Sequence, residues 1–416
     1  DLRGLDEDLI DWMPLFAEAL TKMGAAGLDY AALAEREAAC SGGAHAAASA
    51  GGRVDDAAHV QPFLSVQIKA LDHKLEDMLG VLADRVLRAD FTDRDRLRDV
   101  ILQGKVHRHA HVIPAGSHFA MLHALRHLSR NGELTERFSG IAQVRHFDRT
   151  AERFDDDPEA IVDRLQRIQR FVLARDRLFA SIVADEPQQK TICSWLAGVA
   201  GELGSADVPE ASSDFTPEAG TREAVAAPAD VAFVAAALPA LQADHPDAPA
   251  LLLLGLQLSF GHLWNELRVK RGAYGAHAGF HPANGTFTFS SYRDPCIQET
   301  LKTYAEVFDY VATDMDLSPA AVEQAIIGTL KAQDRPIRPP QAAGTALGRY
   351  LNGETPAFRN AFRQRLLGLT ADDIRRASAE VLAPGFARAA TCVLSGREKL
   401  EAANEALDKP LAISDL

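Results

Sequence analysis

The amino-acid sequence predicts an α+β protein with two related layered domains, each a mainly antiparallel sheet packed with long helices and joined by a linker. Three observations favour this class. Hairpin-type strands are interleaved with long helical stretches, which is typical of separate layers rather than of a βαβ wind. The length of 416 residues suits about two domains. A polar stretch also divides the chain into two halves whose ends look alike.

The first half combines helical stretches with an alternating strand. Leu64, Val66 and Ile68 alternate with polar residues, so residues 64–70 are predicted as a half-buried strand. This half is predicted to end in a helix, an apolar strand, a turn at Glu186-Pro187 and a second helix. The predicted helices are 7–23, 72–88, 93–111, 158–175 and a last one that ends near 203, and the apolar strand is 178–184.

Residues 204–228 are rich in Ser, Pro, Glu and Ala and have no apolar periodicity. Such a composition is typical of a linker. We therefore expect one domain at 1–203 and another at 229–416.

The second half contains a clear hairpin. The Asn284-Gly285 turn is predicted to join strands at 274–280 and 286–291. Helices are expected at 298–313 and at 319–332. The half ends in a helix that opens with a Thr370/Asp373 capping box, a strand at 389–394, a turn at Ser395-Gly396, and a helix to about 407. The similar helix–strand–helix endings of the two halves predict a duplicated fold.

Composition excludes several classes of function. The formal net charge is −14, which disfavours a nucleic-acid partner and favours cationic peptides. We expect no membrane span, because no apolar run approaches about 18 residues. The four cysteines form no CxxC pair, which indicates a reducing compartment. The sequence opens at Asp1 without a signal peptide, so we expect a fragment or a processed chain.

Several histidines have spacings that could suit metal ligands. His107 and His111 have helical i, i+4 spacing, and His118, His123 and His127 follow, but no acidic residue near His107 and His111 supplies a third ligand. We interpret these histidines as helix-surface or interdomain residues.

The His73-Lys-Leu-Glu76-Asp77 segment resembles an inverted zinc motif with one change. The motif H-x-x-E-H needs a second histidine, and Asp77 stands in its place. We expect a solvent-facing charged helix here and no metal site in this chain. A self-contained zinc hydrolase that uses these residues is the weaker alternative. The sequence contains no nucleophile elbow, Walker loop or dinucleotide fingerprint.

The densest group of chemically useful residues is Gly-His-Leu-Trp-Asn-Glu-Leu-Arg-Val-Lys-Arg-Gly-Ala-Tyr-Gly, residues 261–275. Arg268 near a helix C-terminus is well placed against the helix dipole, which is its structural interpretation. Tyr274 can likewise be a strand aromatic. Gly272 and Gly275 flank Ala273-Tyr274 and let a ligand approach the backbone closely. An Arg and a phenol held together could hydrogen-bond a carbonyl or an oxyanion.

Residues 267–275 resemble the R-V-K-G-G-A-Y-G segment of presequence proteases and falcilysin, which are pitrilysin/insulysin-type zinc metallopeptidases. Residues 291–295 resemble their S-Y-R-D-P segment. The resemblance continues in collinear order over essentially the whole chain, at residues 13–16, 41–43, 115–118, 325–328, 333–336 and 351–354.

The resemblance implies a specific part of such an enzyme. These peptidases have four related α+β domains in two halves that close around a chamber, and the zinc motif lies in the N-terminal half. This chain is similar to the C-terminal half only and starts inside the third domain. Zinc is therefore expected on the missing N-terminal half, and no cofactor is expected in this chain.

The resemblance also implies roles for single residues. Arg268 and Tyr274 would hydrogen-bond the substrate carbonyl and stabilise the tetrahedral intermediate. Gly272, Ala273 and Gly275 would line the substrate-binding loop. One departure is Arg271, where the family usually has Gly, and it adds charge beside the site.

The expected function is the non-zinc half of a metalloendopeptidase that degrades short unstructured peptides, with cationic ones favoured. The chain should be inactive alone and active with its zinc-bearing partner half. The alternative is a non-catalytic binding or assembly subunit of the same fold. A bacterial cytoplasm is the favoured location, and an organelle matrix is the alternative.

Overall fold

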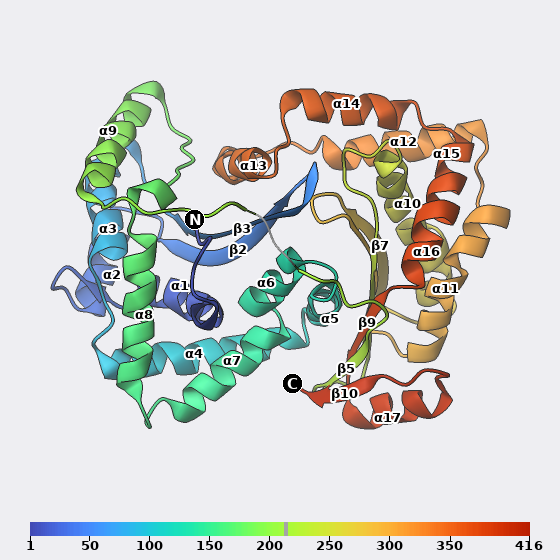
Figure 1. Ribbon diagram of the computed structural model, residues 1–416, viewed down its shortest axis with the longest axis horizontal. Helices are drawn as coiled ribbons and strands as arrows, with labels where there is room; N and C mark the ends of the chain where they lie inside the picture. The colour runs from blue at the N-terminus through green and yellow to red at the C-terminus, as the bar shows by residue number, and fades with distance from the viewer. Residues whose placement is uncertain (212–214) are drawn as a thin grey trace.

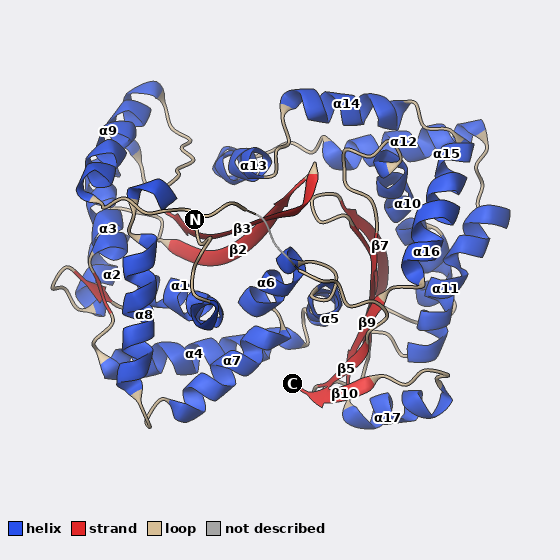
Figure 2. Ribbon diagram, in the orientation of Figure 1, coloured by secondary structure: helices blue, strands red, loops and turns tan. Residues whose placement is uncertain are grey.

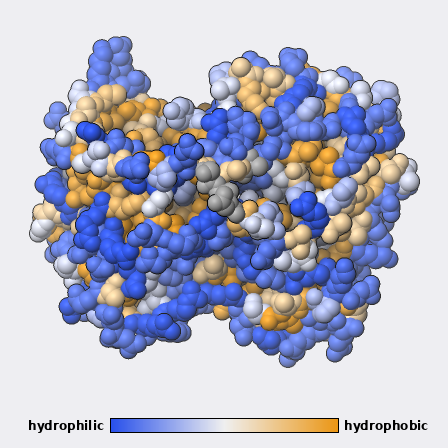
Figure 3. Space-filling model, in the orientation of Figure 1, coloured by the Kyte–Doolittle hydropathy of each residue, from blue (hydrophilic) through white to orange (hydrophobic). Residues whose placement is uncertain are grey.

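The computed structural model describes residues 1–211 and 215–416, which form two lobes of helices and strands (Figures 1 and 2). The first half of the chain forms the lobe drawn in blue to green, and the second half forms the lobe drawn in yellow to red. The mixture of helices with mainly antiparallel strands confirms the predicted α+β class. The space-filling view shows the two lobes joined at a waist, with a notch above and below it (Figure 3).

The first half is mostly helical. The predicted helix at 7–23 is a 3-10 turn that continues into α1, and the other predicted helices of this half are confirmed within a few residues. Its elements are η1 (Glu7–Trp12), α1 (Met13–Lys22), β1 (Gly24–Ala25), α2 (Tyr30–Ala38), β2 (His45–Arg53), β3 (Asp56–Gln67), η2 (Asp72–Lys74), α3 (Leu75–Leu87), β4 (Ala89–Asp90), α4 (Arg94–Val112), α5 (Gly116–Leu125), α6 (Arg130–Ser139), α7 (Ile141–Arg153), α8 (Pro158–Val172), η3 (Arg175–Arg177) and α9 (Glu186–Glu202).

The β2–β3 ribbon is the main β structure among the described residues of this half. The two strands pair antiparallel, with Ala48 opposite Leu64 and Ala46 opposite Val66. Leu64 and Val66 pack against the core of α1 and α4, as the alternation predicted. The predicted strand at 64–70 is therefore confirmed in part, since β3 begins earlier and ends at Gln67.

The predicted strand at 178–184 was wrong. These residues run extended between η3 and α9 and join no sheet among the described residues. Leu178, Phe179 and Val183 are exposed. A β-strand needs a neighbouring strand to satisfy its backbone groups, and an apolar sequence alone cannot provide one.

The second half contains a six-stranded sheet. Its predicted hairpin, capping box and terminal helix are confirmed. Its elements are β5 (Arg222–Ala226), β6 (Phe233–Pro239), α10 (Ala248–Phe260), η4 (Trp264–Val269), β7 (Gly275–His281), β8 (Thr286–Tyr292), α11 (Ile297–Thr313), α12 (Pro319–Gln333), α13 (Pro339–Leu351), α14 (Pro356–Leu367), α15 (Ala371–Arg376), η5 (Ala377–Leu382), α16 (Ala383–Phe386), β9 (Ala390–Ser395), α17 (Arg397–Ala406) and β10 (Ala412–Asp415).

The strand order is β10-β5-β9-β6-β8-β7, and only the β10–β5 and β5–β9 pairs are parallel. Strand β5 lies inside the segment predicted as a linker, so that prediction was wrong for residues 222–226. Ala224 and Val225 are buried because β9 and β10 flank them, a context that the short local sequence does not reveal. The predicted linker also includes residues 212–214, which lie outside the described residues.

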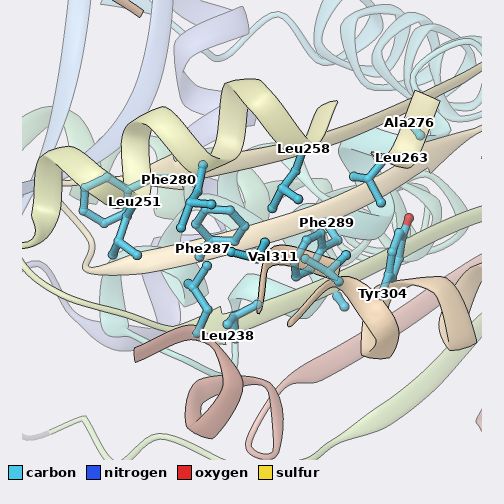
Figure 4. Close-up of a cluster of buried hydrophobic side chains, with 14 of the residues drawn as sticks. Leu238, Leu251, Leu258, Leu263, Ala276, Phe280, Phe287, Phe289, Tyr304 and Val311 are labelled. Carbon is cyan, nitrogen blue, oxygen red and sulfur yellow. The ribbon is translucent and has the colours of Figure 1, made fainter. Parts of the chain in front are cut away.

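Each face of this sheet has its own hydrophobic core. On one face, α10 and α11 cover Phe287 and Phe289, and the buried Tyr304 stacks on Phe289 (Figure 4). On the other face, helix α5 of the first half lies across β6 and β9. Gly116 at the start of α5 lies so close to Phe233 that a β-carbon would come within 2.4 Å of the ring. The two halves therefore share a core, while the division at 203 and 229 stays a prediction.

Two further findings limit the classes of function. None of the helices in the described part of the chain has the length and apolar character needed to cross a membrane. Across residues 1–211 and 215–416, no group of three or more His, Cys, Asp or Glu side chains is placed to hold a metal ion.

Candidate functional site

The Arg268–Tyr274 region forms where a helix ends and the edge strand of the sheet begins. Helix α10 stops at Phe260, and the chain continues through Gly261 into the π-helical segment η4. Leu263 and Leu267 are fully buried and fix this segment on the sheet. Gly272 then adopts a φ of +82°, which reverses the chain into β7. A left-handed residue at this point favours glycine.

Arg268 is exposed, and its guanidinium lies over the ring of Trp264. Its Cζ atom lies 4.0 Å from the Trp264 ring centroid and 5.7 Å from that of Tyr274. Within the described part of the chain, its guanidinium makes no ion pair and no side-chain hydrogen bond. The charge is therefore held in place by aromatic rings and stays available to a ligand.

Tyr274 is exposed as well, with 67% of its surface accessible. Its ring packs edge-on against Tyr292 at a centroid distance of 5.8 Å, and its backbone N–H donates to the Tyr292 carbonyl. Tyr292 in turn donates its hydroxyl to the Pro114 carbonyl at 3.1 Å. The Tyr274 hydroxyl has no hydrogen-bond partner in residues 1–211 or 215–416. The structure thus brings the two predicted side chains together.

The other predicted substrate-binding residues are placed differently from one another. Gly272 is exposed and Gly275 is half-buried, but the Ala273 side chain is buried in the core. The N–H groups of Gly272 and Ala273 donate to the carbonyls of Arg268 and Leu267. A ligand could therefore approach this loop, but these amides are already used within the chain.

Arg271, the departure from the family pattern, is bonded to a neighbouring glutamate. Its guanidinium donates to the Glu266 carbonyl at 2.8 Å and to the Glu266 carboxylate at 3.1 Å. Lys270 donates to the other carboxylate oxygen at 2.6 Å. These bonds, first from Lys270 and then from Arg271, hold the pKa of Glu266 below its usual value. Glu266 therefore neutralises both cations, and Arg268 remains as the free charge of η4.

An acidic groove lies beside η4, between this segment and α11. Its cavity volume is about 520 Å³, and His262 stacks on Tyr310 in its wall at 4.2 Å. Burial lowers the pKa of His262. The groove is lined by His262, Asn265, Glu266, Glu306, Asp309, Tyr310 and Asp314.

The histidine candidates do not form a metal site in the described residues. The rings of His107 and His111 lie 4.1 Å apart on the exposed face of α4. His118 is half-buried on α5, and its pKa is lowered by burial. His123 and His127 lie at the contact between the halves, where they meet glutamates, as an interdomain role predicts.

The altered zinc motif is a solvent-facing stretch, as expected. His73, Glu76 and Asp77 are exposed at the start of α3, and Asp77 pairs with Lys74 at 3.6 Å. These side chains do not form a ligand set. The self-contained zinc hydrolase has no structural support in the described residues.

Three residues of the site were not singled out from the sequence. Trp264 supports Arg268, Tyr292 supports Tyr274, and Arg293 follows Tyr292 with its Cζ atom 5.7 Å from the Tyr292 ring centroid. The i, i+4 spacing of Trp264 and Arg268 on a helix was a usable signal. Tyr292 and Arg293 lie within the S-Y-R-D-P segment, where the resemblance could have pointed to them.

Comparison with known proteins defines the class. A family model for the region associated with peptidases of family M16, subgroup C, matches residues 1–149, and one described as "PreP C-terminal domain" matches residues 222–386. The structure of a peptidase M16 inactive domain from Pseudomonas fluorescens superposes with a TM-score of 0.60 at 17% identity. That match covers 92% of this chain and 87% of the other. The fold is therefore that of a C-terminal, inactive-type M16 peptidase module.

Curated relatives make the assignment more specific. The mitochondrial presequence protease of Yarrowia lipolytica is 27% identical over 385 residues, which is 92% of this chain. That of Danio rerio is 27% identical over 394 residues, which is 89% of this chain. This chain spans 38% of the length of either relative. The chain is thus related to presequence proteases and corresponds to their C-terminal part.

Proposed function

We propose that this chain is the non-zinc half of a zinc metalloendopeptidase that degrades short unstructured peptides. The observation that carries the proposal is the Arg268–Tyr274 pair. Both side chains are exposed, ring contacts orient them, and neither the guanidinium nor the hydroxyl is consumed by a partner in the described residues.

The pair can stabilise a tetrahedral intermediate through charge and hydrogen bonding. The carbonyl oxygen of a scissile peptide bond becomes an oxyanion when water adds to it. A fixed guanidinium and a phenol O–H bind that oxyanion more strongly than the neutral carbonyl, so they lower the barrier. Stacking on Trp264 means that Arg268 needs little reorganisation during the reaction.

Zinc itself does not fit this chain. The described residues contain no cluster able to hold it, so we assign the ion to a separate N-terminal half. There it would supply the activated water.

Charge supports a preference for cationic peptides. The net charge is −14, and the groove beside η4 is lined by four carboxylates. Opposite charge raises the rate at which peptides are captured and weakens with salt.

A cleavage assay tests the proposal. A quenched, cationic, unstructured peptide in zinc buffer should stay intact with this chain alone and be cut when the N-terminal half of a presequence protease is added. Arg268→Ala and Tyr274→Phe should each lower turnover by about 10²–10³. Arg271→Ala is the matched control and should leave turnover nearly unchanged, since Arg271 is committed to Glu266. Chelator-sensitive cleavage by the chain alone would contradict the proposal.

A non-catalytic binding or assembly subunit is the second candidate. The likeness to a structure described as an inactive M16 domain favours it. Silence in every mixture, together with peptide binding by the chain, would support this candidate. A bacterial cytoplasm and an organelle matrix both remain proposals for its location.

A further inference from the structure

Arg293 has an unusual backbone conformation. Its φ is +48°, and among the described residues the only other non-glycine residue with positive φ is Ala26, at +54°. A β-carbon is disfavoured in this left-handed region, which glycine or asparagine would occupy more readily. Such strain persists only where the surrounding structure enforces it, and it is often found at functional sites.

The residues around Arg293 enforce this conformation. Tyr292 is paired with Gly275 at the end of the β7–β8 ladder. Asp294 is fully buried and exchanges two backbone hydrogen bonds of 2.8 Å with Ala232. The turn between these two anchors leaves Arg293 projecting at the surface.

The arginine is not needed as a counter-ion for its buried neighbour. The Asp294 carboxylate accepts hydrogen bonds from the Cys296 N–H at 2.9 Å and from the Thr300 hydroxyl at 2.6 Å. Arg293 makes no ion pair with Asp294 or with any other residue in 1–211 or 215–416. A folded chain with an excess of carboxylates thus holds a strained, exposed arginine that serves no internal charge.

Arg293 belongs to the same surface as the Arg268–Tyr274 pair. The Tyr274 and Tyr292 rings meet at 5.8 Å, Arg268 lies 5.7 Å from the first ring, and Arg293 lies 5.7 Å from the second. Two unpaired guanidinium groups therefore flank a pair of tyrosines. Arg268 is placed for the reacting carbonyl, which leaves the second guanidinium without an assigned ligand.

We propose that Arg293 is a specificity-determining residue that binds a carboxylate of the peptide near the bond held by Arg268 and Tyr274. A guanidinium matches a carboxylate with two parallel N–H···O bonds. The carboxylate comes from an acidic side chain or from the C-terminus of the peptide. The identification of the ligand as a peptide rests on the proposed function, whereas the recognition of a carboxylate rests on Arg293 itself.

Binding to the chain alone tests the inference without any hydrolysis. The probes are three fluorescein-labelled peptides of one sequence: with a free C-terminal carboxylate, with a C-terminal amide, and with an amide plus one internal Glu. Fluorescence anisotropy should show at least one carboxylate form binding about tenfold more tightly than the neutral amide, and comparison of the two forms identifies the source. Arg293→Gln should remove the preference, and Arg293→Lys should keep part of it.

A matched control separates local recognition from net charge. Arg149 is exposed on α7 and makes no ion pair in the described residues, so Arg149→Gln removes the same charge elsewhere. It should leave the preference intact. Equal binding of all three peptides by the parent chain, or a preference that survives Arg293→Gln, would overturn the inference.

Thermal stability provides a readout that a merely structural arginine would not reproduce. Arg293→Gly relieves the left-handed strain, so its Tm should equal or exceed that of the parent while the carboxylate preference is lost. Ala26→Gly is the matched control and should behave alike in Tm with the preference unchanged. A clear fall in Tm for Arg293→Gly would instead indicate a structural role and sink the proposal.

Cleavage by the mixed halves distinguishes this inference from the proposed function. Arg293→Gln should raise KM about tenfold for the carboxylate peptide with kcat unchanged, while Arg268→Ala lowers kcat for all peptides. Failure of cleavage alone counts against the proposed function, because the binding assay still decides on Arg293. Cleavage without any carboxylate preference counts against Arg293 alone.

Discussion

Single residues in this protein show how an environment decides what a charged group can do. Arg268 and Arg271 are three positions apart on the same turn. Arg271 is bonded to Glu266, whereas Arg268 lies over Trp264 at 4.0 Å. A carboxylate partner consumes the hydrogen-bonding capacity of a guanidinium, but an aromatic face leaves its edge donors free. The available cation is therefore chosen by its neighbours.

His146 is the clearest pH-sensitive residue. It is buried on α7, where its ring packs edge-on against Trp12 at 4.7 Å, and its Nε2 has no partner in the described residues. Burial lowers its pKa from 6.5 to about 4, and the nearby arginines add to this effect, while Asp11 opposes it. The folded protein thus keeps this histidine neutral where the unfolded chain takes up a proton.

The first prediction concerns this histidine. Between pH 6.5 and about 4, the unfolded state binds a proton that the folded state does not, so the free energy of unfolding should fall as pH falls through this window. The loss should be on the order of 3 kcal/mol and should add nothing below the folded pKa. Urea unfolding in half-unit pH steps measures it. His146→Gln should flatten the slope, while the exposed His107→Gln should not. An unchanged slope in His146→Gln would refute the assignment.

At the scale of elements, strand β7 illustrates how an exposed sheet edge is protected. Helix α10 lies against it, and the Ser259 hydroxyl accepts a hydrogen bond from the Ala278 N–H at 2.8 Å. The same hydroxyl lies 2.7 Å from the Gly255 carbonyl and 3.0 Å from the Ala278 carbonyl. Gly255 allows this approach, since a β-carbon there would meet the Gly279 backbone at 3.2 Å. The helix thus satisfies edge groups that would otherwise invite another strand.

The second prediction follows from this contact. Ser259→Ala leaves the Ala278 N–H without a partner beneath a helix, so it should lower the free energy of unfolding by about 1–3 kcal/mol. Ser139→Ala is the matched control. Its exposed hydroxyl bonds only to the Thr135 carbonyl, so the change should stay within about 0.5 kcal/mol. Denaturant unfolding compares the two variants, and equal effects would contradict the proposed role of Ser259.

The whole molecule depends on a contact between its halves. His127, just after α5, lies 3.0 Å from the Glu218 carboxylate and 2.8 Å from that of Glu223, and Arg126 donates to Glu223 at 2.7 Å. Burial raises the pKa of Glu223, but the hydrogen bonds of His127 and Arg126 outweigh it and bring the pKa to about 2. These bonds join the first half to β5 beside the shared core of α5.

The third prediction tests this connection. The folded pKa of Glu223 is about 2 against an ordinary 4.5, so its contribution is present above pH 4.5 and is lost as pH falls toward 2. Glu223→Gln should remove about 1–3 kcal/mol at pH 7, allowing for its partial exposure, and should weaken the acid dependence below pH 4.5. Hydrogen exchange should show faster opening of α5 and β5. The exposed Glu186→Gln serves as the control, and identical acid profiles for both variants would exclude this role.

The sequence alone determined those features whose signals are local. Caps, turns and periodicity predicted the helices and the β7–β8 hairpin, and the collinear motifs led to the family and to Arg268 and Tyr274. Only the tertiary structure decided that residues 178–184 pair with no strand in the described part of the chain, that 222–226 do, and that α5 crosses to the other half. It also placed Arg293, whose backbone is set by Asp294 and Ala232. Strand pairing, shared burial and enforced strain depend on residues distant in sequence, and no local pattern encodes which partner will be present.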